Sequence, residues 1–347
     1  MEPLVKWNEG LERRVELVKS LMPEQFECYF EPFLGGGAVY FQMEGQTCFV
    51  NDKCRELMSI YKYARMESPA FARQFKMMCK GWKNMESLYL GIIDELEEVT
   101  LRNQRGGYRD FIHFVQSVNE VVDRIGYSDI FLYTIPDPAD FKMEKRHQVI
   151  QEIIRMEKLG EISDEDMELN LLTALKQSIY SFLVEVSNKN RVDSEIRAAA
   201  LAFVLNYSAD VPFKKLNREY RPTFGGKLIA KKHLSAQVKM LGSEQLKNHF
   251  SRTTFGTVDA MTFLKRHAPG VDDFVLLDPP EEVKKNPGAL EYSPEDYREL
   301  TRYLLKDCEA KWMLLAAPNI SAMPAFQKAH VRIRQVEGMD KLIVTNY

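Results

Sequence analysis

Apolar residues occur at two spacings that divide the 347-residue chain into three stretches. Towards both ends, short apolar runs bounded by turn residues predict β-strands, whereas between about residues 68 and 190 apolar residues recur at the helical spacing. Strands that alternate with helices favour a mixed, mostly parallel sheet covered by helices, with ligands at the carboxyl ends of the strands. One strand is predicted to begin at Cys28, and the others cover residues 47–52, 252–258, 274–277, 311–317, 331–336 and 341–346.

Helices are predicted from the same analysis of spacing. Apolar residues from Leu11 to Leu21 fall on one face of a helix that ends before Pro23, and further helices are expected at 53–64 and 294–306. The clearest helix follows Ser163, whose hydroxyl is placed to cap it. Its core face is formed by Leu171, Leu172, Leu175, Ile179, Phe182, Leu183 and Val186. Residues 156–166, with a glycine and several acids, are expected to form an exposed turn before it.

A glycine-rich turn follows the strand that begins at Cys28. Gly35, Gly36 and Gly37 allow positive φ and a close approach of the backbone to a ligand, and the turn is expected to open a helix. The next strand ends in Asp52, about fifteen residues beyond the glycines, where a carboxylate can accept hydrogen bonds from ribose hydroxyls. The turn alone is typical of a structural loop, but with Asp52 it predicts half of a nucleoside-binding site.

A second group of acceptors follows the apolar run 274–277. Asp278, Pro279, Pro280 and Glu281 stand at the end of that predicted strand. Hydrogen bonds from an exocyclic amino group to the Asp278 carboxylate and the Pro279 carbonyl would localise the nitrogen lone pair towards an electrophilic methyl group, without a metal. Any strand that ends in a polar residue and a proline would give similar letters, so this motif gains weight only from the glycine turn.

Charge is distributed unevenly along the chain. The net charge is −3, but residues 214–233 contain seven basic residues and the single acid Glu219. This concentration predicts contact with phosphates, although a solvated loop would have a similar composition. The residues expected to make these phosphate contacts are Lys214, Lys215, Arg218, Arg221 and Lys227. A second glycine-containing loop, 101–109, contributes Arg102, Arg105 and Arg109 as candidates, with an ordinary loop between helices as the alternative.

Other residue types narrow the class of protein. The five cysteines and six histidines show no spacing typical of metal ligands or of a disulfide framework, so no metal is predicted. No run of 18 apolar residues occurs, and the first residues carry no charged-then-apolar leader. The sequence therefore predicts a cytoplasmic enzyme of about two domains with no membrane contact.

Taken in chain order, these motifs resemble those of the Dam-type, alpha-group DNA adenine-N6 methyltransferases. Lys6 and Trp7 resemble the amino-terminal cofactor motif of that family, and residues 31–37 resemble its cofactor loop. Residues 50–61 resemble its ribose strand and next helix, 217–227 its DNA-contacting loop, 277–280 its catalytic strand and 341–347 its last strand. The resemblance covers about the first 65 and the last 110 residues.

The resemblance implies an α/β fold, with a Rossmann-like S-adenosylmethionine-dependent methyltransferase domain at 1–66 and 235–347. Residues 67–234 would form an inserted, mainly helical target-recognition domain with the basic loop. The implied activity is methylation of N6 of an adenine flipped out of double-stranded DNA, with a cognate restriction system as a further partner. The cofactor-binding residues would be Lys6, Trp7, Glu31, Pro32, Phe33, Gly35, Gly37, Asp52 and Asp259, the last also placed to cap a helix. The catalytic residues would be Asp278, Pro279, Pro280 and Glu281.

Two departures from the family pattern leave alternatives open. The family has an aromatic residue at position 281 that stacks on the flipped base, whereas Glu281 cannot stack, so Tyr292 or Tyr297 is the candidate replacement. The run after Trp7 also differs from the family. A degenerate methyltransferase fold that binds DNA without catalysis is therefore one alternative. A methyltransferase that acts on another base or on RNA is the other.

Overall fold

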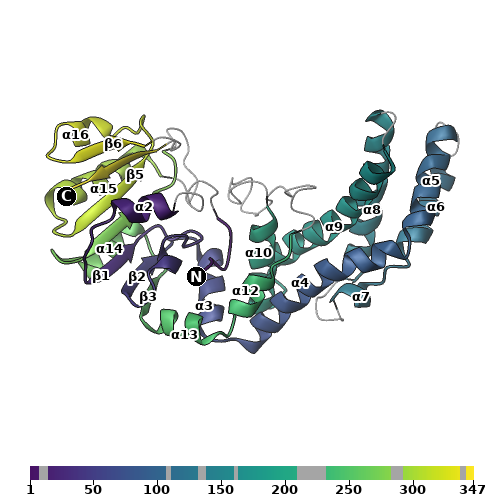
Figure 1. Ribbon diagram of the computed structural model, residues 1–347, viewed down its shortest axis with the longest axis horizontal. Coiled ribbons are helices and arrows are strands. Elements are labelled where there is room, and N and C mark those ends of the chain that lie inside the picture. Colours follow the sequence, from purple (N-terminus) through teal and green to yellow (C-terminus); the bar gives the residue numbers. More distant parts are fainter. Residues whose placement is uncertain are drawn as a thin grey trace. The chain divides into compact units, whose positions relative to one another are not determined.

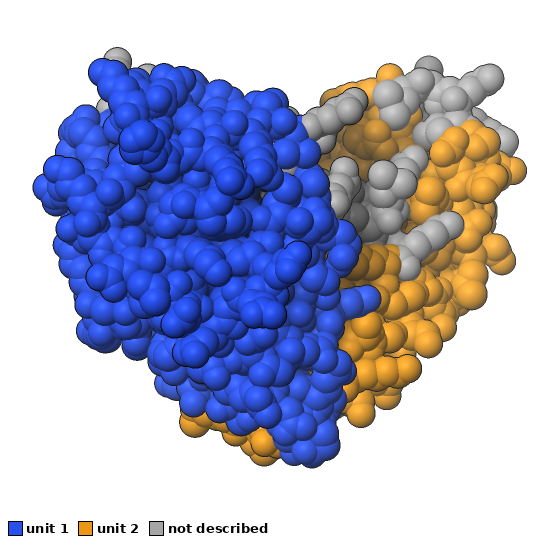
Figure 2. Space-filling model, turned by 60° about the vertical axis from the view of Figure 1, so that its left-hand side comes forward, with its two compact units in different colours: residues 1–65, 242–347 blue, residues 66–241 orange. Residues whose placement is uncertain are grey.

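The chain forms two compact units, coloured separately in Figure 2, in a computed structural model. One unit comprises Met1–Arg65 with Gly242–Tyr347, and the other comprises Met66–Leu241. The structure describes residues 1–7, 15–106, 111–131, 138–159, 163–208, 232–282, 292–336 and 341–347. Residues 235–241, which the sequence analysis assigns to the catalytic domain, group with the second unit.

The first unit is built on a seven-stranded sheet with the order β3-β2-β1-β4-β5-β7-β6 (Figure 1). The strands are β1 (Cys28–Glu31), β2 (Thr47–Asn51), β3 (Thr253–Gly256), β4 (Phe274–Leu277), β5 (Lys311–Ala316), β6 (Arg332–Gln335) and β7 (Leu342–Thr345). Strands β1 to β5 pair in parallel, whereas β7 is antiparallel to both β5 and β6. The predicted strands and the predicted Rossmann-like α/β fold class are confirmed.

Helices of the first unit pack their apolar side chains against this sheet. They are α2 (Val15–Leu21), η1 (Tyr40–Gln42), α3 (Arg55–Arg65), α13 (Glu244–Ser251), α14 (Ala260–His267), α15 (Pro294–Lys306) and α16 (Met323–Gln327). Apolar side chains of α14, α15 and α16 form one buried cluster with Phe30, Val275 and Trp312 of the strands. The predicted helix at 294–306 is confirmed, and Ser293 with Asp296 closes its first turn as a capping box.

The named elements of the second unit are all helices, joined by turns and short loops in its described residues. Its helices are α4 (Pro69–Leu90), α5 (Ile93–Gly106), α6 (Phe111–Val122), α7 (Tyr127–Phe131), α8 (Pro138–Leu159), α9 (Asp164–Asn188), α10 (Ser194–Tyr207) and α12 (Ser235–Met240). Every residue of α10 from Ala198 to Tyr207 is buried, so this helix forms the centre of the unit, in contact with α4 and α9. None of the described helices is long and apolar enough to cross a membrane.

Two predictions for the stretch before α9 have different outcomes. The cap is confirmed, because the Ser163 hydroxyl accepts a hydrogen bond from the Asp166 N–H at 3.2 Å. The exposed turn predicted at 156–166 is wrong over its first four residues, which belong to α8. Val149, Ile153 and Met156 are fully buried and lie at the helical spacing, so the apolar stripe of α8 continues into this segment.

Candidate active site

Four carboxylates gather at the carboxyl edge of the parallel strands. Glu31 is the last residue of β1, Asp52 follows β2, Asp259 lies shortly after β3, and Asp278 follows β4. The pKa of Glu31 is raised from its ordinary value of 4.5 to about 8, mainly by burial, with the charges of Asp278 and Asp52 as smaller contributions. Residues from distant parts of the sequence therefore act on one another in one site.

The glycine turn is held on three sides by protein atoms. Gly35 (φ +50°) donates its N–H to Asp52 Oδ2 at 3.0 Å, and its carbonyl accepts a hydrogen bond from the Tyr61 hydroxyl at 2.9 Å. A β-carbon on Gly35 would lie 2.6 Å from Trp7 Cδ1, so a larger residue would displace this indole. Gly37 has a φ of +68°. The predicted need for positive φ is confirmed at both glycines, and the close approach at Gly35 is to Trp7.

The helix expected to open at this turn does not form. The residues after the glycines make only the short 3-10 helix η1. Residues 38–41 are all buried, and the Tyr40 hydroxyl bonds to Thr253 Oγ1 at 2.8 Å, so tertiary contacts rather than a helical hydrogen-bond ladder hold this segment. The Gly35 and Gly37 N–H groups donate to Asp52 and to the Leu34 carbonyl, so hydrogen bonds within the protein fix the shape of the turn.

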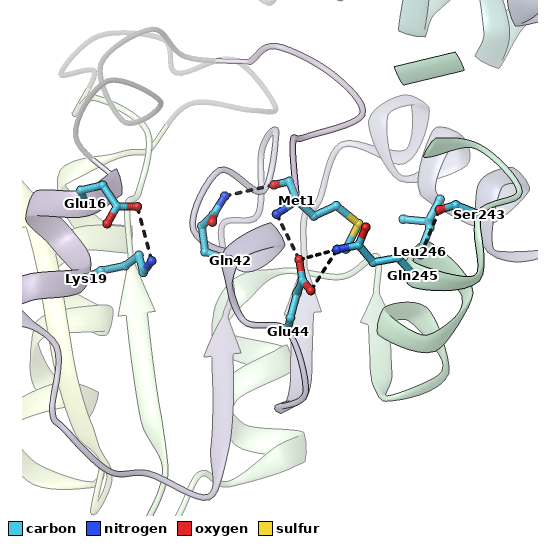
Figure 3. Close-up of polar contacts among 8 residues, drawn as sticks. All are labelled: Met1, Glu16, Lys19, Gln42, Glu44, Ser243, Gln245 and Leu246. Atoms are coloured by element: carbon cyan, nitrogen blue, oxygen red, sulfur yellow. Dashed lines mark hydrogen bonds and ion pairs between the residues drawn. The ribbon is translucent and has the colours of Figure 1, made fainter. Parts of the chain in front are cut away.

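The amino-terminal segment that carries Lys6 and Trp7 is tied at its first residue to η1 and to the loop before β2 (Figure 3). The Met1 carbonyl accepts a hydrogen bond from the Gln42 side chain at 3.0 Å, and the Met1 ammonium pairs with Glu44 at 3.1 Å. The Gln245 amide donates to both oxygens of Glu44 at 3.0 Å. These contacts fix the start of the segment whose Trp7 covers the glycine turn; Lys6 is half-buried.

Asn51, the last residue of β2, joins the loops that follow its two neighbouring strands, β1 and β3. Its amide donates to the Pro32 carbonyl at 3.1 Å and to the Val258 carbonyl at 3.0 Å, and its side-chain oxygen accepts from the Val258 N–H at 3.0 Å. The Asn51 side chain is fully buried. One side chain thus holds the predicted cofactor loop, through Pro32, beside the loop that leads to Asp259.

Asp259 caps α14, as the sequence predicts. Its Oδ1 accepts hydrogen bonds from the Met261 N–H at 2.9 Å and the Thr262 N–H at 3.2 Å. The residue is exposed, and its second oxygen accepts no hydrogen bond from the described residues. Capping therefore leaves one carboxylate oxygen for a ligand, and the cofactor role of Asp259 stays a prediction.

The methylation-site motif is anchored by two side chains from other elements. Asp278 pairs with the Lys341 ammonium, and the two side chains are only 13% and 24% exposed. The Pro280 carbonyl accepts a hydrogen bond from the Tyr297 hydroxyl at 2.9 Å. Pro279 is buried, and its carbonyl accepts no hydrogen bond from the described part of the chain. One oxygen of Asp278 and the Pro279 carbonyl thus remain as the two acceptors that the motif predicts.

The two tyrosines that could replace the stacking residue beside the exposed Glu281 are both buried. Tyr292 and Tyr297 are each only 2% exposed and pack edge to face, with ring centroids 5.1 Å apart. Tyr292 also packs against the half-buried Phe33 at 5.3 Å. The expectation that one of these tyrosines replaces the stacking residue is wrong for this arrangement, because their rings are part of the apolar core below the motif.

Most of the predicted DNA-contacting residues lie outside the described residues. These are Lys214, Lys215, Arg218, Arg221 and Lys227, together with Arg109. Residues 101–106 are the end of α5, so the loop predicted at 101–109 is wrong over that stretch; Leu101, Arg102, Gln104 and Arg105 all have high helix propensity. Arg102 is exposed and pairs with Glu98 one turn earlier, and Arg105 belongs to the same helix. The described residues contain no cluster of three side chains suited to a metal ion.

Sequence reasoning missed the hydrogen bonds that four residues make in the site. Asn51, Tyr61, Tyr297 and Lys341 each bond to a predicted site residue or to the loop that carries it. Asn51 had a usable signal, because a polar residue at the end of an apolar strand needs buried partners. Tyr61 and Tyr297 had none, since an aromatic residue on the apolar face of a helix reads as core.

Comparison with known proteins agrees with this geometry over part of the chain. A family described as "D12 class N6 adenine-specific DNA methyltransferase" matches residues 13–133, which include the glycine turn and Asp52 but end before Asp278. A stretch of 62 residues is 37% identical to "Type II methyltransferase M1.LlaDCHI" of Lactococcus lactis subsp. cremoris. That stretch is 18% of this chain and 22% of the relative, so the chain matches only about a fifth of the relative's length. This part of the chain resembles adenine-N6 DNA methyltransferases.

The pH dependence of the folding stability tests whether the buried Glu31 is protonated in the folded protein. Glu31 is 1% exposed and accepts a hydrogen bond from the Tyr29 hydroxyl at 2.7 Å, and its pKa is raised to about 8. Between pH 4.5 and about 8 the folded protein therefore holds a proton that the unfolded chain releases. The stabilisation is present below pH 4.5 and is lost as pH rises through about 8, with a slope of up to about 1.4 kcal/mol per pH unit.

Glu31→Gln is expected to remove this slope, because a glutamine keeps the hydrogen bond from Tyr29 without titrating. Denaturant unfolding at pH 5.5, 6.5 and 7.5 measures this slope as the difference in unfolding free energy between the wild type and the variant. The wild-type protein should lose stability relative to Glu31→Gln at each step. If the unfolding free energies of the two proteins changed in parallel with pH, the assignment of a protonated Glu31 would be contradicted.

Proposed function

We propose that this protein transfers the methyl group of S-adenosylmethionine to N6 of adenine in double-stranded DNA, as an enzyme of the Dam-type subgroup. The observation that carries the proposal is the shared edge, where the Asp278 motif and the glycine turn with Asp52 act on the same buried Glu31. The family match at residues 13–133 supports the same activity from an independent direction.

The donor set at this edge fits the proposed cofactor. S-adenosylmethionine carries a positive sulfonium, an ammonium and two ribose hydroxyls, all of which seek acceptors or negative charge. The edge supplies carboxylates, and each Asp52 oxygen, already bonded to the N–H of Gly35 or Cys54, retains a second lone pair. We propose that Asp52 receives the ribose and Asp259 the adenine, with Lys6, Trp7, Phe33 and the glycine turn as the surrounding wall.

The two acceptors of the motif prepare the amine for reaction. When bound, the cofactor supplies a methyl group on a sulfonium, which passes to N6 as the S–C bond breaks and the N–C bond forms. The second oxygen of Asp278 and the Pro279 carbonyl accept the two amino hydrogens and so localise the nitrogen lone pair. Asp278 can then take the proton that the methylated amine releases. Pro280, held by Tyr297, fixes the direction of the preceding carbonyl.

Recognition of DNA is assigned to the second unit and the basic segment. An adenine must leave the duplex to reach the motif, so we propose a flipped base with phosphate contacts from Lys214, Lys215, Arg218, Arg221 and Lys227. Arg102 and Arg105 of α5 are proposed as further contacts. The printed name of the lactococcal relative supports a role beside a cognate restriction system, and a cytoplasmic location follows from the substrates.

Glu281 supports one competing function, a methyltransferase fold that binds DNA without catalysis. Neither Tyr292 nor Tyr297 replaces the stacking residue, since both are buried. Calorimetry separates the two proposals. Binding of DNA with no detectable binding of S-adenosylmethionine would favour the non-catalytic protein.

Transfer of tritiated methyl from labelled S-adenosylmethionine to unmethylated DNA tests the proposal. The wild-type protein is expected to label duplex DNA, and mass spectrometry of the digested DNA should identify N6-methyladenine. Parallel reactions with RNA and with DNA that lacks adenine identify another substrate. Label in cytosine or in RNA, or no label in any substrate at saturating cofactor, would overturn the proposed activity.

A further inference from the structure

We propose that Lys341 is a positioning residue that orients the Asp278 carboxylate towards the amine, an inference that rests on the proposed methyl transfer. Lys341 lies 63 residues after Asp278, and the two side chains form an ion pair. The resemblance at residues 341–347 concerns a strand and assigns no role to this ammonium.

Strand direction explains how a residue from the end of the chain reaches the motif. The parallel strands present their last residues at the ligand edge, but β7 is antiparallel to β5 and presents its first residues there. Leu342 pairs with Ala316, the last residue of β5, and β5 lies beside β4. Lys341, immediately before Leu342, therefore stands at the same edge as Asp278.

The ion pair between Lys341 and Asp278 is shielded enough from water to hold the Asp278 side chain in one orientation. Surface ion pairs are weak because water screens the charges and the side chains stay mobile. Here Asp278 is 13% exposed and Lys341 is 24% exposed, so the carboxylate meets less water than in a surface pair. A carboxylate can rotate freely unless one oxygen is held. With Oδ1 bound to Lys341, Oδ2 is the oxygen left for an amino hydrogen.

Charge gives Lys341 a second effect on the same group. Asp52 and Asp278 lie at this edge beside the protonated Glu31, and Glu281 and Glu282 follow the motif. An ammonium against Asp278 offsets part of this negative charge, which would otherwise repel both the other carboxylates and DNA phosphates. Loss of Lys341 would free Asp278 to turn away from its neighbours. This change should impair the orientation of the Asp278 carboxylate more than the binding of S-adenosylmethionine or DNA.

Lys341→Met and Lys341→Arg test the inference in the methyl-transfer assay. Methionine keeps much of the side-chain volume without charge, whereas arginine keeps the positive charge and can pair with a carboxylate. The expected result for Lys341→Met is a fall in kcat on the order of 10²-fold, with the KM for S-adenosylmethionine changed by less than about threefold. Lys341→Arg should recover most of the lost kcat.

Lys265→Met is the matched control, since Lys265 pairs with Glu299 at 2.7 Å on the surface of the same unit. It should leave kcat unchanged. An active wild type with an equally active Lys341→Met overturns the positioning role alone. An equal loss in the methionine and arginine variants, or a rise in KM with kcat unchanged, would also overturn it. A wild type inactive on every substrate overturns the proposed function and this inference with it.

Discussion

Asp278→Ala is expected to reduce the rate of methyl transfer at saturating substrates by at least about 10²-fold. The loss is on the order of 10³-fold if the Asp278 carboxylate is fully aligned with the amino group. Alanine removes the acceptor for one amino hydrogen and the base that receives the released proton. It also leaves the Lys341 ammonium without its carboxylate partner. Tritiated-methyl incorporation under single-turnover conditions measures the chemical step separately from product release.

Two variants of the same residue type make this result specific. Asp272→Ala changes an exposed acid beyond the other end of β4 and should retain wild-type activity. Asp278→Asn keeps an oxygen acceptor but loses the charge, so its activity should fall between those of wild type and Asp278→Ala. Full activity in Asp278→Ala would remove the carboxylate from the reaction, and the proposed chemistry would then fail at its central residue.

The sheet was predictable because its signals are local. Each strand is a short apolar run with clear limits, and the run at 274–277 matches β4 residue for residue. Once the strands are parallel, the residues after them must meet at one edge, which is why Glu31, Asp52 and Asp278 could be grouped from sequence. The glycine turn was predictable for the same reason, since the ability to adopt positive φ is a local property of glycine, as Gly35 and Gly37 show.

Features that depend on tertiary packing were not predictable in this way. The turn was expected to open a helix, but the four residues after it are buried by tertiary contacts and only the short η1 forms. The sequence is the same whether Tyr292 and Tyr297 face a base or the core. Only their packing, Tyr292 against Phe33 and Tyr297 against Tyr292, shows that they are buried. Lys341 could be placed only after β7 was known to be antiparallel, because a parallel strand would put it at the opposite edge.

Asn51→Leu is expected to cost at least about 3 kcal/mol of folding free energy, the largest loss of stability from a single side chain at the edge. Leucine matches asparagine in size but leaves the Pro32 carbonyl and both backbone groups of Val258 without their partner. Each buried polar group left unpaired costs about 1–3 kcal/mol. Urea unfolding monitored by circular dichroism measures the loss.

Stability alone would not show that Asn51 serves the site, and Asn346 provides the comparison. The Asn346 side chain bridges Ala310 and the Trp312 N–H, at 2.9 and 2.8 Å, around the start of β5, at the opposite edge of the sheet. Asn346→Leu should therefore destabilise the same unit without changing the affinity of the folded protein for S-adenosylmethionine. Asn51→Leu should weaken that affinity by about tenfold or more, because the cofactor loop loses its link to the Asp259 loop. Equal affinities in the two variants, measured by calorimetry where both are folded, would restrict Asn51 to a role in folding.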